Sequence, residues 1–445
     1  MDAVLLSRIQ FAVTIGFHFI FAPLTIGLSW FIAWLTNRYR KTGDPLHRQL
    51  ARFWTSVFAL SFAVGVATGI TMEFQFGTNW SKYSRFVGDI FGAPLAAEGI
   101  FAFFLESTFL GVMLFGWDRV SRKVQAFAAL MVAVGSTLSA FWILAANSWM
   151  QTPTDYILRN NRAELTNFWG AVFNLSTIPR FLHTVDAALM TGALFMMGIS
   201  AWYLLKGRHV EASRLTLTVS LAVAFVTALL QLVTGHYHAI QVAFTQPAKL
   251  AAIEGVYATQ SHAPLLVFGI PDTEHETMRY AIRLPGALSF AAFGNSSAVV
   301  KGLDAYPKDQ RPYVPLTFYP FHLMVALGMF FILFTAVGIF LRWRKKLFTY
   351  RPYLILSLLV IPLPFLANEL GWMTAEVGRQ PWIVYNVLRT GDAISITVPV
   401  AQILASLIIF SLIYTLLFII WIAFLRRAIN RRPEDTSTLP KTEAA

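Results

Sequence analysis

The chain has 445 residues, of which 56% are hydrophobic and only 13% are charged, and its formal net charge is +12. Because soluble domains carry about 25% charged residues, this composition excludes a soluble globular protein and indicates an integral membrane protein. The chain contains no cysteine, which excludes disulfides, iron–sulfur clusters, thiolate-bound copper and covalent C-x-x-C-H haem attachment. Any redox chemistry must therefore use His, Met and carboxylate ligands.

Nine apolar windows are long enough to cross the ~30 Å hydrocarbon layer of a bilayer. The first is longer than a signal-peptide core and lacks a small-residue cleavage site, so we expect it to remain as a span. We predict an all-α integral membrane protein whose nine transmembrane helices form a bundle. The expected spans cover residues 11–36, 53–76, 95–117, 124–148, 180–205, 215–240, 314–341, 353–376 and 393–425.

Basic residues predict the orientation of these spans. One set of connecting segments holds 21 Lys and Arg against six Asp and Glu, whereas the rest of the chain holds 14 basic and 17 acidic residues. The positive-inside rule places the basic set in the cytoplasm, with the N-terminus outside and the C-terminus inside. The basic surplus therefore indicates topology and not nucleic-acid binding. The basic segments are 37–52, 118–123, 206–214, 342–351 and 426–445.

This topology divides the chain into four parts. Residues 1–240 hold the first six helices, 241–313 form an external loop, 314–425 hold the last three helices, and 426–445 are a cytoplasmic tail. A loop as long as 241–313 is usually either functional or disordered. No internal repeat of 20–50 residues is visible.

Several spans contain side chains that could ligate a metal. An ionisable group inside a span costs roughly 2.5–3.5 kcal/mol and is a functional hypothesis by default. His18, His183, Met324 and Glu376 all fall in the outer part of the predicted bilayer, within about three helical turns of its surface. His and Met from facing helices can hold a low-spin haem. Taken singly, each His also fits a hydrogen-bonded packing role, and Met324 also fits a core filler.

Two carboxylates share one apolar stretch. Glu106 follows Glu98 by eight residues, which places it about 12 Å deeper in a helix. A buried Glu has a raised pKa, so this pair suits a proton relay, although a helix–helix hydrogen-bond pair is the alternative. Glu73 closes the preceding span near the same face. Arg379, in a Gly-Arg-Gln-Pro-Trp turn, fits either an interfacial anchor or a carboxylate-binding group.

Several phrases in one order resemble subunit I of the cytochrome bd quinol oxidases, over essentially the whole chain. They run from the N-terminus through the paired carboxylates and the external loop to the Gly-Arg-Gln-Pro-Trp turn. The phrases are Leu6-Ser7-Arg8-Ile9-Gln10 with His18-Phe19, Glu73-Phe74, Pro94–Gly99, Phe103–Phe109, Phe115–Arg119, Phe181–Thr184, Gln246–Glu254 and Trp372–Trp382.

The resemblance implies three haems. His183 and Met324 would be the axial ligands of a low-spin haem b that accepts electrons from quinol. His18 and Glu376 would be axial ligands in a dihaem centre, made of a high-spin haem b and a haem d, with a further haem b as the alternative to haem d. Which of these two haems each residue serves stays open.

The resemblance also implies roles for other residues. Glu98 would sit beside the dihaem centre and Glu106 on the proton path to it. Lys249 and Glu254 would contact quinol, with Glu254 as a proton acceptor. The residues expected to support the haems are Arg379, Trp372, Glu73 and Arg8.

The implied assembly is a bacterial terminal oxidase of the cytoplasmic (inner) membrane. Its reaction oxidises quinol outside and reduces O2 to water with protons from the cytoplasm, so it is electrogenic. The implied partners are a second large membrane subunit and small single-helix accessory subunits. Two features depart from well-known members: His322 stands where Arg is expected, and the external loop is short, as in the short-loop branch, for which the cyanide-insensitive type is one candidate.

Three other classes of protein fit these residues less well. A haem–copper oxidase needs a copper held by three His, typically with an adjacent pair, and the nine His of this chain include no such pair. A membrane transporter predicts broken helices and clustering at the midplane, whereas these candidates lie off-centre. A haem-containing quinol oxidoreductase that does not reduce O2 is disfavoured by the extra ligands His18 and Glu376.

Overall fold

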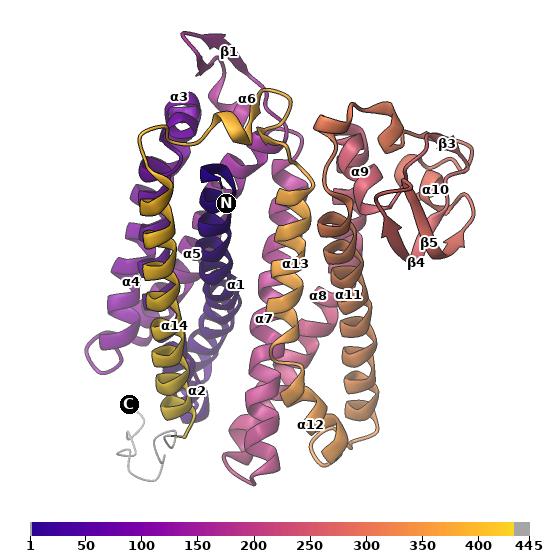
Figure 1. Cartoon of the computed structure of the whole chain (residues 1–445). Helices are drawn as coiled ribbons and strands as arrows, with labels where there is room; N and C mark the ends of the chain where they lie inside the picture. The colour runs from indigo at the N-terminus through magenta and orange to yellow at the C-terminus, as the bar shows by residue number, and fades with distance from the viewer. Residues whose placement is uncertain (1, 431–445) are drawn as a thin grey trace.

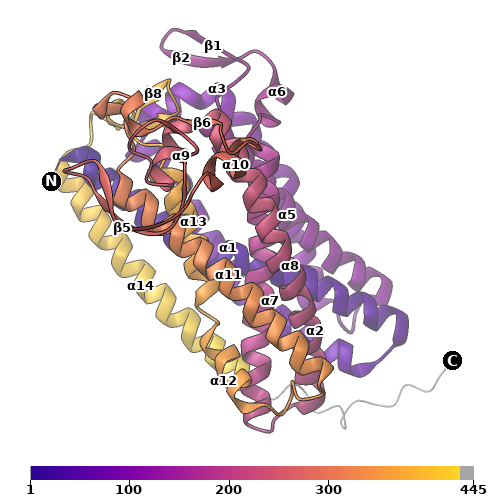
Figure 2. The ribbon, with the colours of Figure 1, turned by 90° about the vertical axis from the view of Figure 1, so that its right-hand side faces the viewer.

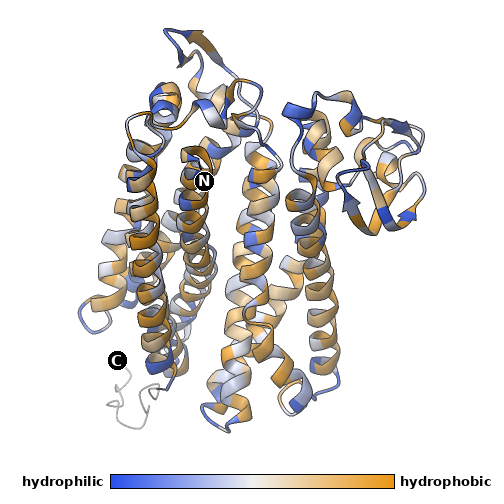
Figure 3. Cartoon of the chain, in the orientation of Figure 1, coloured by the Kyte–Doolittle hydropathy of each residue, from blue (hydrophilic) through white to orange (hydrophobic). Residues whose placement is uncertain are grey.

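The computed structural model describes residues 2–430, and nine helices in this part of the chain are long and apolar enough to cross a membrane. They stand side by side as a bundle (Figure 1), with mostly apolar residues along their length (Figure 3). The predicted all-α bundle of nine transmembrane helices is confirmed. The helices are Ala3–Thr42 (α1), Pro45–Thr78 (α2), Ser81–Phe115 (α3, η1 and α4), Arg122–Gln151 (α5), Thr177–Leu205 (α7), Val210–Thr245 (α8), Val314–Trp343 (α11), Arg351–Val377 (α12 and α13) and Val400–Asn430 (α14).

The first two helices form a tight antiparallel hairpin. Gly43 ends α1 with a φ of 70°, in the left-handed region that glycine adopts without strain, and donates its N–H to Tyr39 O at 2.8 Å. The next residue, Asp44, caps α2 by accepting the N–H of Leu46 at 2.9 Å. Because only these two residues separate the helices, α1 and α2 must pack against each other.

The third span begins earlier than the sequence predicts. It runs from α3 (Ser81–Ala97) through a π-helical segment, η1 (Glu98–Phe103), into α4 (Phe104–Phe115). The predicted window opened at residue 95 because Lys82, Arg85 and Asp89 interrupt the apolar run before it. These charges lie on one face of an amphipathic α3, whose other face is buried.

Prolines change the last two spans. The eighth is broken into α12 (Arg351–Leu359) and α13 (Leu363–Val377), because Pro362 and Pro364 lack the N–H groups that a continuous helix needs. The ninth begins at Val400, directly after Pro399, and not at residue 393 as the sequence predicts.

A close glycine contact joins the two helices that carry the candidate His ligands. A Cβ built at Gly27 on α1 would lie 2.4 Å from Ala188 O and 2.8 Å from the Cα of Gly192 on α7. The two backbones therefore meet directly, as in other membrane interfaces built from small residues. This contact fixes the position of α1 relative to α7.

The external loop is folded against the ends of α8 and α11. Its hydrophobic core includes Ala251, Leu266 and Leu288 of the loop and Phe318 of α11. Figures 1 and 2 show these elements gathered at one end of the bundle, beside α11. The loop contains α9 (Pro247–Ile253), β3 (Gln260–Ser261), β4 (Leu265–Asp272), β5 (Thr277–Leu284), α10 (Ala287–Phe293), β6 (Val299–Val300), η2 (Leu303–Ala305) and η3 (Lys308–Gln310).

Other short elements lie at the same end. A hairpin of β1 (Tyr156–Arg159) and β2 (Arg162–Leu165), followed by α6 (Phe168–Val172), connects α5 to α7. The loop between α13 and α14 pairs β7 (Trp382–Val384) with β8 (Leu388–Arg389) and ends in η4 (Thr390–Asp392). The start of α1 lies toward this end and the end of α14 lies at the other (Figure 1). Residues 431–445 of the predicted tail lie outside the described residues.

Candidate functional site

His18 lies on α1 with its ring against α2. Its Nδ1 is 3.1 Å from the carbonyl oxygen of Gly65 and 3.1 Å from Oγ1 of Thr68. A Cβ built at Gly69 would lie 3.3 Å from Cε1 of His18, so the glycine lets the ring approach this closely. Helix α2 therefore sets the orientation of the imidazole, as the surroundings of a metal-ligating His commonly do.

His183 lies on α7 with its ring against α8. Its Nδ1 is 3.2 Å from Oγ1 of Thr234, and the amide nitrogen of Gln231 is 3.0 Å from its Nε2. A Cβ built at Gly235 would lie 3.1 Å from Cε1 of His183. The ring of His238, further along α8, is 5.9 Å from that of His183 between centroids. Side chains from one face of α8 therefore line one side of this histidine.

Met324 lies on α11 and reaches α13. A Cβ built at Gly371 of α13 would lie 2.9 Å from the sulfur of Met324. Since α13 packs against both α7 and α11, His183 and Met324 come from helices that share one neighbour. His322, two residues before Met324, instead places Nδ1 3.0 Å from Phe318 O and Nε2 3.1 Å from Leu266 O, which ties α11 to β4.

Glu376 is the centre of a buried polar network at the C-terminal end of α13. Arg379 donates to its Oε2, while Asn147 and Gln151 of α5 donate to its Oε1 at 3.0 and 3.2 Å. The side chains of Arg379 and Glu376 are only 4% and 15% exposed. The sequence prediction overlooked both α5 residues, although two amides four residues apart in an apolar span were a visible signal.

Lys249 of α9 joins the same network. Its ammonium nitrogen donates to Oε1 of Gln151 at 2.6 Å, and Gln246 donates to the same oxygen at 3.0 Å. Burial, with a further contribution from Arg180, holds the pKa of Lys249 well below its usual range. Gln151 therefore connects Lys249, a predicted quinol residue, to Glu376, a predicted iron ligand. Because the amine points inward in this arrangement, its contact with quinol stays a prediction.

The network carries more positive than negative groups. The guanidinium groups of Arg180 and Arg379 both act on the carboxylate of Glu376, and Arg180 donates to Oδ1 of Asn147 at 3.2 Å. Nε of Arg180 and both Nε and Nη1 of Arg379 are buried, with no hydrogen-bond partner among the described residues. Since unpaired buried cations are costly, this end of the bundle favours a further anion.

The residues fit a haem. Its propionates would supply the missing negative charge, and guanidinium groups bind carboxylates in a bidentate geometry. Among residues 2–430 no three His, Asp or Glu side chains gather in a way that would hold a metal ion by themselves. A haem iron needs only one or two axial side chains from the protein. His18, His183, Met324 and Glu376 offer the required types of atom.

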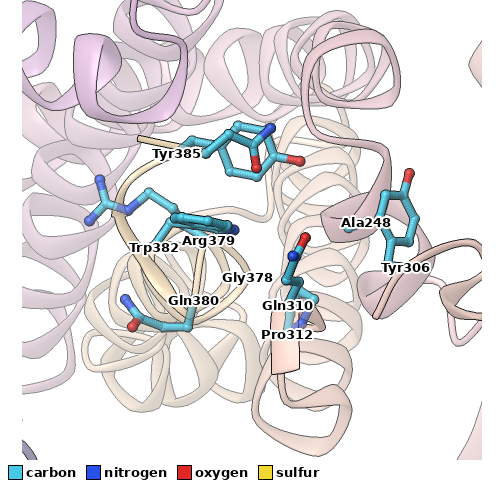
Figure 4. Close-up of a pocket in the computed structure, with 10 residues that line it drawn as sticks. Ala248, Tyr306, Gln310, Pro312, Gly378, Arg379, Gln380, Trp382 and Tyr385 are labelled. Atoms are coloured by element: carbon cyan, nitrogen blue, oxygen red, sulfur yellow. The ribbon is translucent and has the colours of Figure 1, made fainter. Parts of the chain in front are cut away.

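A cavity of about 340 Å³ lies next to this network, between α9, the end of the external loop and the loop after α13. Gly378 lines it, and a Cβ there would lie 2.8 Å from Cγ of Lys249. Asp309 and Arg389 join the two loops through an ion pair of 2.6 Å. Figure 4 shows the lining residues, which are Ala248, Tyr306, Gln310, Pro312, Gly378, Arg379, Gln380, Trp382, Tyr385 and Asn386.

Glu254 follows the last turn of α9 and is 5% exposed. Its Oε2 has no hydrogen-bond partner among the described residues. Burial raises the pKa of this carboxyl to about 8. The group can therefore exchange a proton near neutral pH, as the predicted role requires.

Glu98 and Glu106 both face α5. Glu98 accepts a hydrogen bond from Ser139 at 2.8 Å, and Glu106 accepts one from Ser136. In a regular α-helix, residues eight apart point about 80° away from each other. The wider π turn of η1 lies between the two carboxylates and changes the angle between them, so both side chains reach α5.

The remaining predicted residues are less closely tied to the site. Arg8 and Glu73 lie on exposed faces of the described chain, and Trp372 is half-buried on α13 beside Gly371. Their support of haem stays a prediction.

Comparisons with known proteins agree with one another. A family model described as cytochrome bd terminal oxidase subunit I matches residues 6–433. The chain is 40% identical to cytochrome bd ubiquinol oxidase subunit 1 of Bacillus subtilis (strain 168), covering 98% of this chain and 95% of that protein. It is 36% identical to cytochrome bd-II ubiquinol oxidase subunit 1 of Escherichia coli (strain K12), covering 99% of each. The structure of bd oxidase from Geobacillus thermodenitrificans matches with a TM-score of 0.91 at 34% identity, over 97% of this chain and 99% of that one.

Proposed function

Because the chain belongs to the cytochrome bd terminal oxidase subunit I family, we propose that it oxidises quinol at the outer membrane face and reduces O2 at a dihaem centre. It is a multi-pass membrane subunit of a quinol:oxygen oxidoreductase, and haem is the cofactor that the family implies. One observation carries the finer proposal: Gln151 joins Lys249 of the external loop to Glu376 in a single buried network. A substrate residue and an iron ligand are thereby within two hydrogen bonds of each other.

The haem ligands are His183 with Met324 for the low-spin haem b, and His18 with Glu376 for the dihaem centre. When bound, the haems supply one-electron transfer and the iron at which O2 is reduced. The protein holds their anionic edges with Arg180 and Arg379 at the outer end of the bundle. The second haem of the dihaem centre is a haem d, for which haem b is the alternative.

Quinol binds on the outer side, against α9. Glu254 accepts a proton as quinol is oxidised, because its buried carboxyl has a pKa of about 8 and a free Oε2 oxygen in the described chain. The cavity bordered by Ala248 and Gly378 lies next to Lys249 of the same helix. The quinol protons are thus released on the outer side.

The protons that form water come from the cytoplasm. Glu106 lies deeper than Glu98, and each carboxylate is held by a serine of α5. Carboxyl groups in such positions can pass a proton by switching between their ionised and neutral forms. We assign Glu106 as the inner station and Glu98 as the station beside the dihaem centre, so turnover moves charge across the membrane.

Cytochrome bd oxidases generally pair this subunit with a second large subunit. We propose that small single-helix subunits join the complex and that it lies in the bacterial cytoplasmic membrane. The N-terminus then faces outward and the end of α14 faces the cytoplasm, as the distribution of basic residues predicts.

The first test is a dithionite-reduced minus air-oxidised absorption spectrum of the detergent-purified complex, with pyridine haem analysis of the same sample. A chlorin-type band in the red with two b-type haems is expected, together with quinol-dependent O2 uptake. Only b-type signals with O2 uptake would replace haem d by haem b. Haem without O2 uptake would leave an electron-transfer protein, and absence of haem would favour the transporter class.

A further inference from the structure

The two candidate His ligands sit in matching environments. Each histidine places Nδ1 near the hydroxyl of a threonine on the next membrane helix, at 3.1 Å for His18 and Thr68 and at 3.2 Å for His183 and Thr234. The residue after each threonine is a glycine that faces Cε1 of the same ring.

The two sets also match in the sequence separation between histidine and threonine. Thr68 follows His18 by 50 residues, and Thr234 follows His183 by 51. Each pair joins two consecutive membrane helices, α1 with α2 and α7 with α8, which pack against each other. The two histidines are far apart in the sequence, so no short repeat relates them. We call each His, Thr and Gly set a histidine cradle.

The partners of Nδ1 indicate which ring nitrogen carries the proton. Gly65 O, which can only accept, lies 3.1 Å from Nδ1 of His18, so this nitrogen carries a hydrogen. Oγ1 of Thr68 can then accept from Nδ1 while it donates to Val64 O at 2.9 Å. Oγ1 of Thr234 likewise donates to Gln231 O, at 3.4 Å. Nδ1 of His18 is therefore the protonated nitrogen, which leaves the lone pair of a neutral imidazole on Nε2. Because the surroundings of His183 match, we assign the same tautomer to it.

The surroundings of Nε2 agree with this tautomer in His183. The amide nitrogen of Gln231 lies 3.0 Å from Nε2, where it can donate to the lone pair. Because Nδ1 already carries a hydrogen, the same amide cannot donate to it. Iron at Nε2 requires the Gln231 amide to release this contact.

The glycines supply the space that the cradle needs. A Cβ built at Gly69 or Gly235 would lie 3.3 or 3.1 Å from Cε1, the carbon between the two ring nitrogens. Any larger residue would push the ring away from its threonine. Threonine fixes the rotation of the ring, and glycine fixes its distance from the helix.

We propose that Thr68 and Thr234 are positioning residues that hold Nδ1–H of His18 and His183, so that Nε2 of each binds haem iron. This inference rests on the proposed ligation by these two histidines. An acceptor at Nδ1–H makes the imidazole a more basic ligand, which favours ferric iron. Loss of the hydroxyl therefore moves the haem potential to a more positive value.

The effect differs between the two cradles. His18 has a second acceptor, the carbonyl oxygen of Gly65 at 3.1 Å, which remains when Thr68 is changed. For His183, the only acceptor for Nδ1–H among the described residues is Thr234. We therefore expect Thr234→Val to change the midpoint potential of the haem at His183 more than Thr68→Val changes that of the haem at His18.

The test uses Thr234→Val, Thr234→Ser and the matched control Thr227→Val in the purified complex. Thr227 lies seven residues earlier on the same face of α8, and its hydroxyl donates to Val223 O at 2.9 Å and Ala224 O at 3.2 Å. The readout is the midpoint potential of the low-spin haem from a spectroelectrochemical titration. For Thr68→Val, it is the midpoint potential of whichever haem of the dihaem centre His18 serves, measured in the same titration.

We expect Thr234→Val to keep the low-spin haem at a more positive potential, and Thr234→Ser and Thr227→Val to resemble the wild type. An unchanged potential in Thr234→Val, or an equal shift in Thr227→Val, would overturn the proposal. If Thr234→Val loses haem, retention by Thr234→Ser supports the hydroxyl role and loss in both overturns it. A low-spin haem that survives in His183→Ala would refute the ligand assignment itself, whatever the threonine variants show.

Discussion

Replacement of Arg379 by Gln tests whether the buried network holds the site together. The guanidinium donates to Glu376 and is only 4% exposed, so its loss leaves a carboxylate at the outer end of α13 without its nearest cation. Gln keeps a similar length and a donor group but removes the charge. The amides of Asn147 and Gln151 still donate to Glu376 and Arg180 remains nearby, but no other cation of the described chain pairs directly with this carboxylate.

The size of the effect follows from burial. Removing one partner of a buried ion pair typically destabilises a protein by about 3–5 kcal/mol, because the other charge is left uncompensated. Arg389, ten residues later, offers a matched control. Its ion pair with Asp309 has exposed fractions of 38% and 63%, and such pairs contribute about 0–1 kcal/mol. Arg379→Gln should therefore cost at least about 2 kcal/mol more than Arg389→Gln.

The assay is equilibrium unfolding of the purified complex in mixed detergents, followed through the loss of haem absorption. Arg379→Gln should lose its haems at a markedly lower denaturant fraction than the wild type, whereas Arg389→Gln should follow the wild type closely. Equal losses in the two variants would refute the reasoning, because burial would then not determine the cost.

Three further outcomes are expected. The carboxylate of Glu254 must be ionised to accept a proton, so kcat/KM for quinol should rise with pH and reach half its plateau near pH 8. Glu254→Gln should abolish this rise with pH. A rise that persists in the variant contradicts the role. Glu106→Gln should slow O2 uptake by about 10²-fold or more while all haem bands remain, and loss of the bands would make the residue structural. Gly27→Ala should destabilise the bundle by about 1–3 kcal/mol in thermal unfolding, because its Cβ would overlap α7. Gly328→Ala should leave thermal stability unchanged, because its Cβ meets no atom of the described chain within 4 Å. Equal losses of stability in the two variants would exclude the close contact as the cause.

The sequence by itself determined the number of membrane helices. Backbone groups in lipid must bond within their own helix, so long apolar runs leave few alternatives, and all nine runs form helices. The boundaries were less certain where charge or proline intervened. The amphipathic start of α3 was missed because its charges lower the local hydropathy, and the break before α13 depends on Pro362 and Pro364.

The sequence also supplied the family, because the phrases that surround the candidate residues occur in one order along the chain. It could not show which of these side chains meet. Lys249 and Glu376 are joined only through Gln151, a residue that no phrase singled out. The rotation of α5 and the path of α9 decide this contact, and neither follows from local periodicity.

Tertiary structure alone decided the immediate surroundings of the ligands. Thr68 and Thr234 look like ordinary helix residues in the sequence, and each lies against a histidine about 50 residues away. The π segment between Glu98 and Glu106 likewise changes their phase without any distinctive residue. Hydropathy fixes how many helices cross the membrane, whereas the rotation and close approach of neighbouring helices fix which side chains meet.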